Sequence, residues 1–269
     1  MRVPFLPRPL INGVRRKVFF LIALIAMTFG SLPSLGRGQE PKFRVVAIAE
    51  KGGIHKPFVD AAKVWLAHEA LVDGFAVDYI EDTSKIDDAF LSHYKLFIQL
   101  NFPPYAWTPT AMAAFQRYIE EGRGGWIGFH HATLLGEFDG YAMWPWFSNF
   151  MGGIRFKKYI PTFVTGTVTV EAPTHPVMRG LPTHFIVENE EWYTYDKSPR
   201  PNVHVLASVD ENSYSPASDI KMGDHPVVWT NEHVKARNVY IFMGHHGELF
   251  QNSAFTTLFH NSILWAAQQ

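Results

Sequence analysis

The sequence has no cysteine among its 269 residues. Disulfide bonds, thiolate metal sites and every mechanism that needs a cysteine nucleophile are therefore excluded. Charge is also scarce, because charged residues make up 18% of the chain and the formal net charge is −1. Such a chain lacks the basic surface that binds nucleic acid, so we expect no nucleic-acid partner.

Histidine and aromatic residues are abundant, with 13 His, 22 Phe, 10 Tyr and 8 Trp. An apolar fraction of 47% is typical of a globular protein, and the length suits one large domain with a buried core. The aromatic residues fit a thick core, or a core together with an aromatic-lined cleft of the kind that carbohydrate sites have. Composition leaves these two alternatives open.

The N-terminal segment has the order of a secretory signal peptide. Basic residues from Arg2 to Lys17 precede an almost unbroken apolar run at 18–29, and small or turn-forming residues follow. The run is short for a membrane span, which needs roughly 20 apolar residues, and an uncleaved anchor is the alternative. We expect residues 1–38 to be a cleaved signal peptide and residues 39–269 to form a single domain. The mature protein would then be exported, periplasmic or extracellular, without stable membrane insertion.

Strand and helix patterns alternate along the rest of the chain. We predict strands at 43–49, 75–80, 94–99 and 126–129, with helices at 57–71 and 108–121. This alternation implies right-handed crossovers and a parallel sheet. Further predicted elements are strands at 163–171, 203–209, 227–230 and 238–243, short helical structure at 144–151, a loop at 210–223 and a closing helix at 253–267.

Histidines follow several of these predicted strands. His55 lies in the loop after the first strand, His130 and His131 directly follow the fourth, and His245 and His246 follow the last. In a parallel sheet, the loops after the strands open at one edge, where ligands bind. We therefore predict that His55, His130 and His245 share a site. Which histidine of each adjacent pair faces that site stays open.

The segment 128–132 has the form of a nucleophile elbow. In α/β hydrolases and amidotransferases, a strand ends there in a tight turn flanked by small residues. Here Gly128 and Ala132 are the small residues, and His130 stands at the tip. Glutamine amidotransfer and cysteine proteolysis are excluded, and a serine variant has no serine at this turn. The alternative is a histidine bound to backbone groups at a strand end.

An acidic run at 188–191 precedes two aromatic residues, Trp192 and Tyr193. Those aromatic neighbours indicate that part of the run turns inward. A carboxylate beside imidazoles can ligate a divalent metal ion, or it can orient a histidine for acid–base catalysis. No tight ligand spacing such as H-E-x-x-H is present, so both readings stay open.

Taken together, these blocks resemble the ThuA-like (trehalose utilisation) family over residues 43–267. The matching blocks are the loop ending in His55, GGWIGFH at 124–130, THP with GLP at 174–182, EEWY at 190–193, PVVW at 226–229, VYIFMGH at 239–245 and ILWA at 263–266. The resemblance implies a flavodoxin-like, class I glutamine-amidotransferase-like three-layer α/β fold. Its central sheet would be mostly parallel, with added β elements, and it would carry out no amidotransferase chemistry.

The resemblance also implies a place in sugar catabolism, acting on trehalose-type or 3-keto-glycosides. The predicted catalytic residues are His130, Glu191 and His245. The predicted ligands of one divalent metal ion are His55, His130 and His245, and the predicted contacts to a small carbohydrate are His55, His131, Trp192 and Tyr193. Two departures would reshape the pocket: the family often has DELY at 190–193, and Trp126 interrupts its glycine-rich lead into the elbow.

Two classes of function follow from these residues. The first is an isomerase, lyase or hydrolase, in which an imidazole or carboxylate removes the acidic proton beside a keto group while a metal or second imidazole holds the enolate oxygen. The second is a non-catalytic carbohydrate-binding or sensor module, in which the aromatic segment 144–156 stacks on sugar rings.

Overall fold

The described part of the chain, in a computed structural model, is residues 40–268. The predicted signal peptide at 1–38 lies outside these residues. All the elements below belong to the unit that begins at Glu40. Among the described helices, none combines the length and the apolar character needed to cross a membrane.

Five parallel strands form one half of a nine-stranded sheet. In spatial order they are β2 (Ala76–Ile80), β1 (Arg44–Ala49), β3 (Leu96–Leu100), β4 (Gly125–Phe129) and β11 (Asn238–Ile241). The order 2-1-3-4-5 is that of flavodoxin-like folds, in which ligands bind beyond the carboxyl ends of the strands. Apart from Arg44, every residue of β1, β3, β4 and β11 is buried, as expected for parallel strands covered on both faces.

The other half of the sheet is antiparallel and continues from β11. Its strands are β10 (Pro226–Thr230), β9 (His204–Ser215), β6 (Val164–Val170) and β7 (His184–Glu190). A separate two-stranded sheet pairs β5 (Phe156–Tyr159) with β8 (Tyr193–Tyr195). The predicted loop at 210–223 is wrong in its first part, because β9 continues to Ser215 and pairs there with β6.

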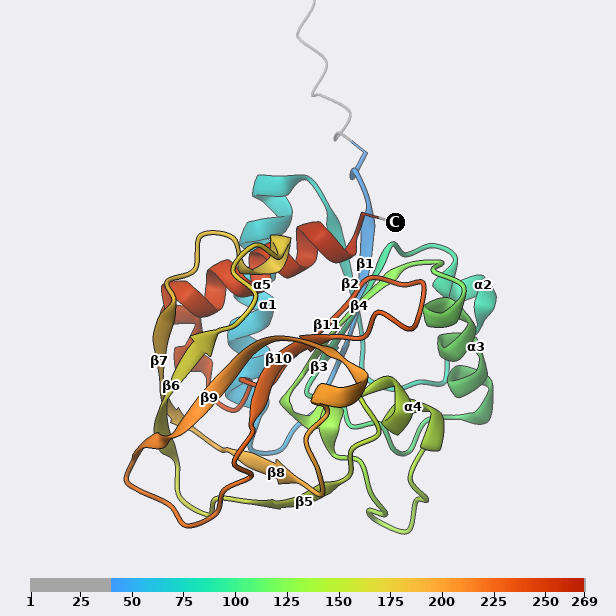
Figure 1. Ribbon diagram of the computed structural model, residues 1–269. Coiled ribbons are helices and arrows are strands. Elements are labelled where there is room, and N and C mark those ends of the chain that lie inside the picture. Colours follow the sequence, from blue (N-terminus) through green and yellow to red (C-terminus); the bar gives the residue numbers. More distant parts are fainter. Residues whose placement is uncertain (1–39, 269) are drawn as a thin grey trace, which may run out of the picture. The chain divides into compact units, whose positions relative to one another are not determined.

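Helices cover both faces of the sheet (Figure 1). The helices α1 and α5 lie on one face, and α2, α3 and α4 lie on the other. Their bounds are α1 (Lys56–Asp73), α2 (Asp88–Leu91), α3 (Pro109–Glu120), α4 (Pro145–Phe150) and α5 (Ser253–Ala266). Across the first layer, the rings of Trp65 and Phe259 stack with centroids 4.6 Å apart. The predicted three-layer α/β fold is confirmed.

The aromatic segment around α4 belongs to the core. Trp144, Phe147 and Phe150 are 6%, 0% and 3% exposed, and Phe150 packs edge-on against Trp126. These rings fill the space between α3, α4 and β4, so they offer no face to a ligand. The prediction that 144–156 stacks on sugar rings is therefore wrong for these side chains, whose apolar surface is already buried by the fold.

Candidate functional site

Backbone strain gathers where the strands end. The described residues other than glycine that have a positive φ angle are Asn101, Ala106, His130, Asp139 and Asn189. The first four lie in segments that follow β3 or β4, and Asn189 is next to the last residue of β7. Such strain costs free energy and is concentrated at functional sites in proteins. This edge of the sheet is also where a flavodoxin-like fold binds its ligands.

His130 occupies the tip of the turn after β4, with φ of 35°. Its carbonyl oxygen accepts hydrogen bonds from Thr133 Oγ1 at 3.0 Å and from Tyr240 Oη at 3.1 Å. Its Nδ1 lies 3.3 Å from the carbonyl oxygen of Phe242. Buried hydroxyl groups thus fix the backbone of the turn, and the Phe242 carbonyl oxygen orients the imidazole of His130.

Close backbone packing joins the ends of β3, β4 and β11. Asn101, which follows β3, donates through Nδ2 to the carbonyl oxygen of Gly244 at 2.7 Å. A Cβ atom on Gly244 would lie 2.8 Å from His130 Cβ and 3.0 Å from Asn101 Oδ1. Only glycine fits this approach without displacement, and the two histidine-bearing loops can therefore lie side by side.

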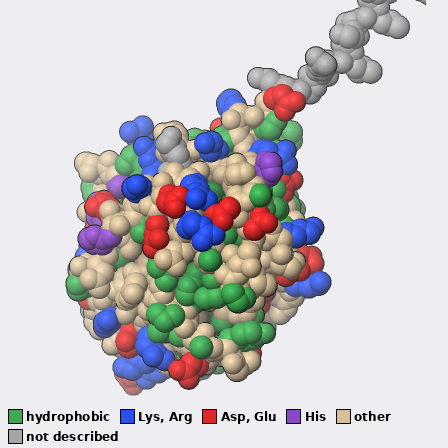
Figure 2. All heavy atoms as spheres, turned by 90° about the vertical axis from the view of Figure 1, so that its right-hand side faces the viewer, with side chains coloured by type: hydrophobic (Ala, Val, Ile, Leu, Met, Phe, Trp, Pro, Cys, Tyr) green, Lys and Arg blue, Asp and Glu red, His purple; other side chains and the backbone are tan. Residues whose placement is uncertain are grey.

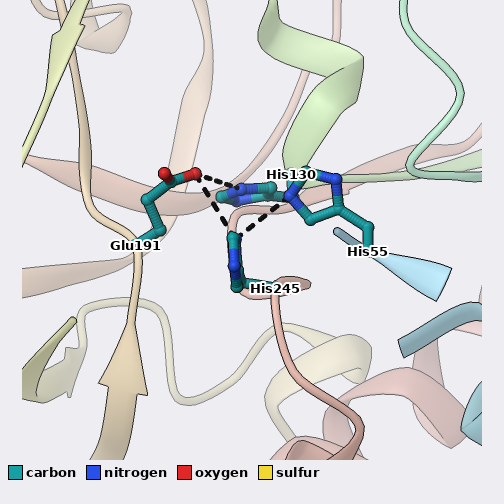
Figure 3. Close-up of side chains that lie close together, drawn as sticks. All are labelled: His55, His130, Glu191 and His245. Atoms are coloured by element: carbon teal, nitrogen blue, oxygen red, sulfur yellow. Dashed lines mark hydrogen bonds and ion pairs between the residues drawn. The ribbon is translucent and has the colours of Figure 1, made fainter. Parts of the chain in front are cut away.

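Four side chains converge at this point (Figure 3). His55 Nε2 lies 3.1 Å from His245 Nδ1. Oε2 of Glu191 lies 3.3 Å from His130 Nε2 and 3.4 Å from His245 Nδ1. His55 comes from the start of α1, His130 from the turn after β4, His245 from the loop after β11, and Glu191 from the connection between β7 and β8.

The hydrogen bonds around the cluster set the tautomers of two imidazoles. Nδ1 of His55 lies 3.1 Å from Glu50 Oε2, and Nδ1 of His130 faces a backbone carbonyl. Both partners are acceptors, so each Nδ1 carries the proton and each Nε2 presents a lone pair to the cluster. The lone pair of His130 then faces the carboxylate of Glu191. Acceptors that face one another in this way require a proton or a cation between them.

The electrostatics favour neutral imidazoles at His130 and His131 and an ionised carboxylate at Glu191. Burial is the main cause that lowers the pKa of His130, to about 4. Burial, followed by the neighbouring His55 and His130, lowers the pKa of His131 well below its ordinary value. For Glu191, burial acts to raise the pKa, but the close ring nitrogens of His130 and His245 outweigh it and hold the pKa well below its usual range. In His130 and Glu191, these are the protonation states that ligate a metal ion.

The donor set fits a divalent metal ion. Three imidazoles and one carboxylate suit zinc and similar transition metals. Metal–ligand bonds of about 2.0–2.2 Å in a tetrahedral site place neighbouring ligand atoms roughly 3.3–3.6 Å apart. The three contacts within the cluster measure 3.1, 3.3 and 3.4 Å, and all four ligand atoms lie within 4.8 Å of one another. Glu50 and the Phe242 carbonyl, which orient His55 and His130, are the outer partners that metal-ligating histidines need.

Glu50 was not predicted as part of the site, and Glu190 was predicted only as one member of the acidic run at 188–191. Glu50 directly follows β1 and contacts two imidazoles, with Oε2 at 3.1 Å from His55 Nδ1 and 3.6 Å from His131 Nδ1. An acidic residue at the end of a buried strand was the signal for it. Glu190 is fully buried and accepts hydrogen bonds from the backbone N–H groups of Gly244 and Glu191, and burial raises its pKa to about 7. It fixes the loop after β11 to the end of β7.

The other predicted contacts lie at different depths. The His131 side chain is 16% exposed, and its ring centroid is 3.9 Å from that of His55. Tyr193 is buried, with its ring 4.3 Å from that of His130. Trp192 lies behind the site with no exposed surface, and its indole donates to the carbonyl oxygen of Val164 at 2.7 Å. A contact between Trp192 and a sugar would require the core to open.

Aromatic side chains flank the site on the segments after β3 and β4. Tyr105 stacks on Phe138 and Tyr141 with centroid distances of 5.5 and 6.2 Å, and Tyr141 is 50% exposed. Burial is the main cause that raises the pKa of Tyr105, and the carboxylates of Asp139 and Glu50 add to it.

The face of the molecule that carries α2 and α3 is shown in Figure 2. In this view, charged side chains of both signs mix in the upper part, and hydrophobic side chains gather below them.

Fold and site together define an amidotransferase-like α/β protein whose elbow carries histidine within a histidine–carboxylate cluster. The model of the ThuA family, described as trehalose utilisation, matches residues 44–266. The chain therefore belongs to the ThuA trehalose-utilisation family, and the predicted resemblance is confirmed.

Solved structures of similar proteins agree with this. A ThuA-like protein from Bacteroides uniformis is 31% identical, with a TM-score of 0.74 over 87% of this chain and 94% of that chain. A ThuA-like protein from Parabacteroides merdae is 18% identical, with a TM-score of 0.59 over 85% of this chain and 90% of that chain, and shares the fold. No curated protein sequence matches the chain significantly.

Proposed function

We propose that this chain is a metal-assisted enzyme of sugar catabolism, an isomerase, lyase or hydrolase acting on a trehalose-type or 3-keto-glycoside. The observation that carries the proposal is the convergence of three imidazole nitrogens and one carboxylate oxygen at the end of the parallel sheet. Membership of a trehalose-utilisation family supports the sugar as substrate. The ligands are His55, His130, His245 and Glu191.

A keto-glycoside suits this donor set. The C–H bond beside its carbonyl group is acidic, because the resulting enolate places negative charge on oxygen. A divalent ion held by these four residues would supply Lewis acidity toward that oxygen by accepting it as a fifth ligand. The proton itself needs a base outside the ligand set, since a ligating nitrogen has no free lone pair.

His131 is the imidazole left for this role. It is the most exposed of the clustered histidines, at 16% against 0% for His55 and His130 and 4% for His245. Burial opposes protonation of His131, but the Glu50 carboxylate, 3.6 Å from its Nδ1, acts in the other direction and favours the imidazolium that forms when His131 takes a proton. We assign His131 as general base and Glu50 as the residue that positions both His131 and His55.

Metal content tests the ligand set. We expect elemental mass spectrometry of the purified protein to find about one divalent ion per chain. The double variant His130→Ala/His245→Ala removes two ligands, one from each histidine-bearing loop, and is expected to lose the ion. His93→Ala is the matched control, because His93 is exposed and lies outside the site. No bound ion, even after divalent ions are added, would refute the metal.

Deuterium uptake tests the chemistry. We expect the protein to catalyse exchange of the proton beside the carbonyl of a 3-keto-glycoside in D2O. Mass spectrometry or NMR then measures the deuterium incorporated into the sugar. His131→Ala should keep the metal and lower the rate by roughly 10²–10⁴-fold, as for loss of a general base. An unchanged rate in this variant would exclude His131 as the base. Saturable sugar binding without exchange or product would favour the carbohydrate-binding module instead.

A further inference from the structure

A cavity of about 620 Å³ opens beside the histidine cluster. Phe163 and His246 are part of its wall, and the ring of Phe163 lies 4.8 Å from that of His245 and 4.4 Å from that of His246. Because His245 belongs to the cluster, the cavity begins where the cluster ends. Its volume lies within the range of about 300–1,000 Å³ that small-molecule sites occupy.

One side of the cavity is apolar and uncovered. Phe163, directly before β6, is 46% exposed, and Ile186 on β7 is 55% exposed. Both line the cavity together with the buried Leu249. A ligand that covers this exposed apolar surface removes it from water, which lowers the free energy and favours binding.

The opposite character comes from two carboxylates. Glu188 and Glu248 also line the cavity, and neither carboxylate forms a hydrogen bond or an ion pair with any group in residues 40–268, although the charge of Glu248 acts on the imidazole of His246. Carboxylates without partners favour a ligand that donates hydrogen bonds. Both are exposed, so they meet such a ligand without being desolvated first.

The cavity is held in shape by the fold. Asn252 donates through Nδ2 to the carbonyl oxygen of Ile186 at 2.8 Å, which ties the start of α5 to β7. Its Oδ1 accepts from the backbone N–H groups of Ala254 and Phe255, at 3.0 and 3.3 Å. Ile186 and Glu188 therefore lie on a braced strand, and Glu248 and Leu249 lie in the 3-10 turn 247–251 that leads into the capped helix α5, so these wall residues require little ordering on binding.

We propose that this cavity binds the intact sugar ring of a disaccharide whose other, oxidised ring reaches the histidine cluster. A pyranose has faces of C–H groups and a rim of hydroxyl donors. Phe163 and Ile186 cover one face, and Glu188 and Glu248 accept from the hydroxyl groups. The inference rests on the proposed function for the reacting ring, while the intact ring is recognised by the cavity alone.

Binding of trehalose and glucose by isothermal titration calorimetry tests the proposal. Trehalose supplies an intact ring next to a second ring, and we expect it to bind at least about tenfold more tightly than glucose. Phe163→Ala is expected to weaken trehalose binding about tenfold without changing the metal content. Tyr79→Ala, which removes a 39% exposed aromatic ring on β2 at the far edge of the sheet, should change neither.

Other variants keep the test decisive. If Phe163→Ala fails to fold, the double variant Glu188→Gln/Glu248→Gln replaces it, and the same loss is expected. The inference is overturned if the two sugars bind with equal affinity, if trehalose does not bind, or if the cavity variants have no effect. It is also overturned if the cavity prefers tetramethylammonium, because an aromatic ring beside two carboxylates would then serve an organic cation and not a sugar. Metal content separates the two proposals. If the protein binds no metal but its trehalose affinity still depends on Phe163, the sugar-binding cavity is supported and the metal-assisted enzyme is refuted.

Discussion

Replacing Gly244 with alanine is expected to spread the histidine cluster apart. The new Cβ atom would lie 2.8 Å from His130 Cβ, 3.0 Å from Asn101 Oδ1 and 3.4 Å from Phe129 Cβ. Carbon atoms pack best at about 3.5–4.0 Å, so the loops after β4 and β11 must separate by roughly 0.7 Å or more. The φ angle of Gly244 is not positive, so alanine adds no backbone strain of its own and the effect is steric.

The expected magnitude follows from this displacement. Metal sites keep their bond lengths within about 0.2 Å, so a shift of this size between His130 and His245 takes one ligand out of range. We expect the affinity for a divalent ion to fall by roughly 10–100-fold, as when an outer partner of a site is removed. Overpacking should also lower the free energy of unfolding by about 1–3 kcal/mol.

Competition titration with a chromophoric zinc chelator measures the affinity, and urea unfolding measures the stability. Gly52→Ala is the matched control, because it lies in the loop before His55, has no positive φ, and its Cβ would meet no atom within 4 Å. The control should behave like the wild type. Wild-type zinc affinity in the Gly244→Ala protein would show that the approach of these two loops does not determine the site.

Two further predictions concern stability. Trp192→Phe removes the buried hydrogen bond to the Val164 carbonyl oxygen, and urea unfolding should show a loss of about 1–3 kcal/mol with the metal content unchanged; an unchanged midpoint would contradict this. Hydrogen bonds from Arg200 lower the pKa of Glu171 and Asp224. Lowered carboxyl pKa values stabilise the fold above the unfolded pKa, so the stability difference between wild type and Arg200→Ala should be fully present at pH 7. It should begin to shrink below about pH 4 and be lost as the pH falls through the lowered folded pKa values. A difference that does not shrink as the pH is lowered would refute the pKa argument.

Elements with a strong local signal were predictable. The strand at β1 is a continuous apolar run, and α3 begins with a capping threonine followed by proline, where Thr108 Oγ1 accepts from the Ala111 N–H at 3.2 Å. The strand β7 was missed, because its alternation includes an acidic end and it is an edge strand that depends on pairing with β6. The extension of β9 to Ser215 was missed for the same reason.

The sequence by itself determined that histidines follow the strands and that Glu191 lies in the EEWY block at 190–193, because position along the chain relative to a strand is a local property. Only the tertiary structure decided that His130 and His245 enter the cluster, while His131 borders it and His246 faces the cavity. Side-chain direction at a turn depends on φ, ψ and close packing. The same packing buries Trp192 and brings Glu50 to the site, since contacts between distant segments have no trace in local pattern.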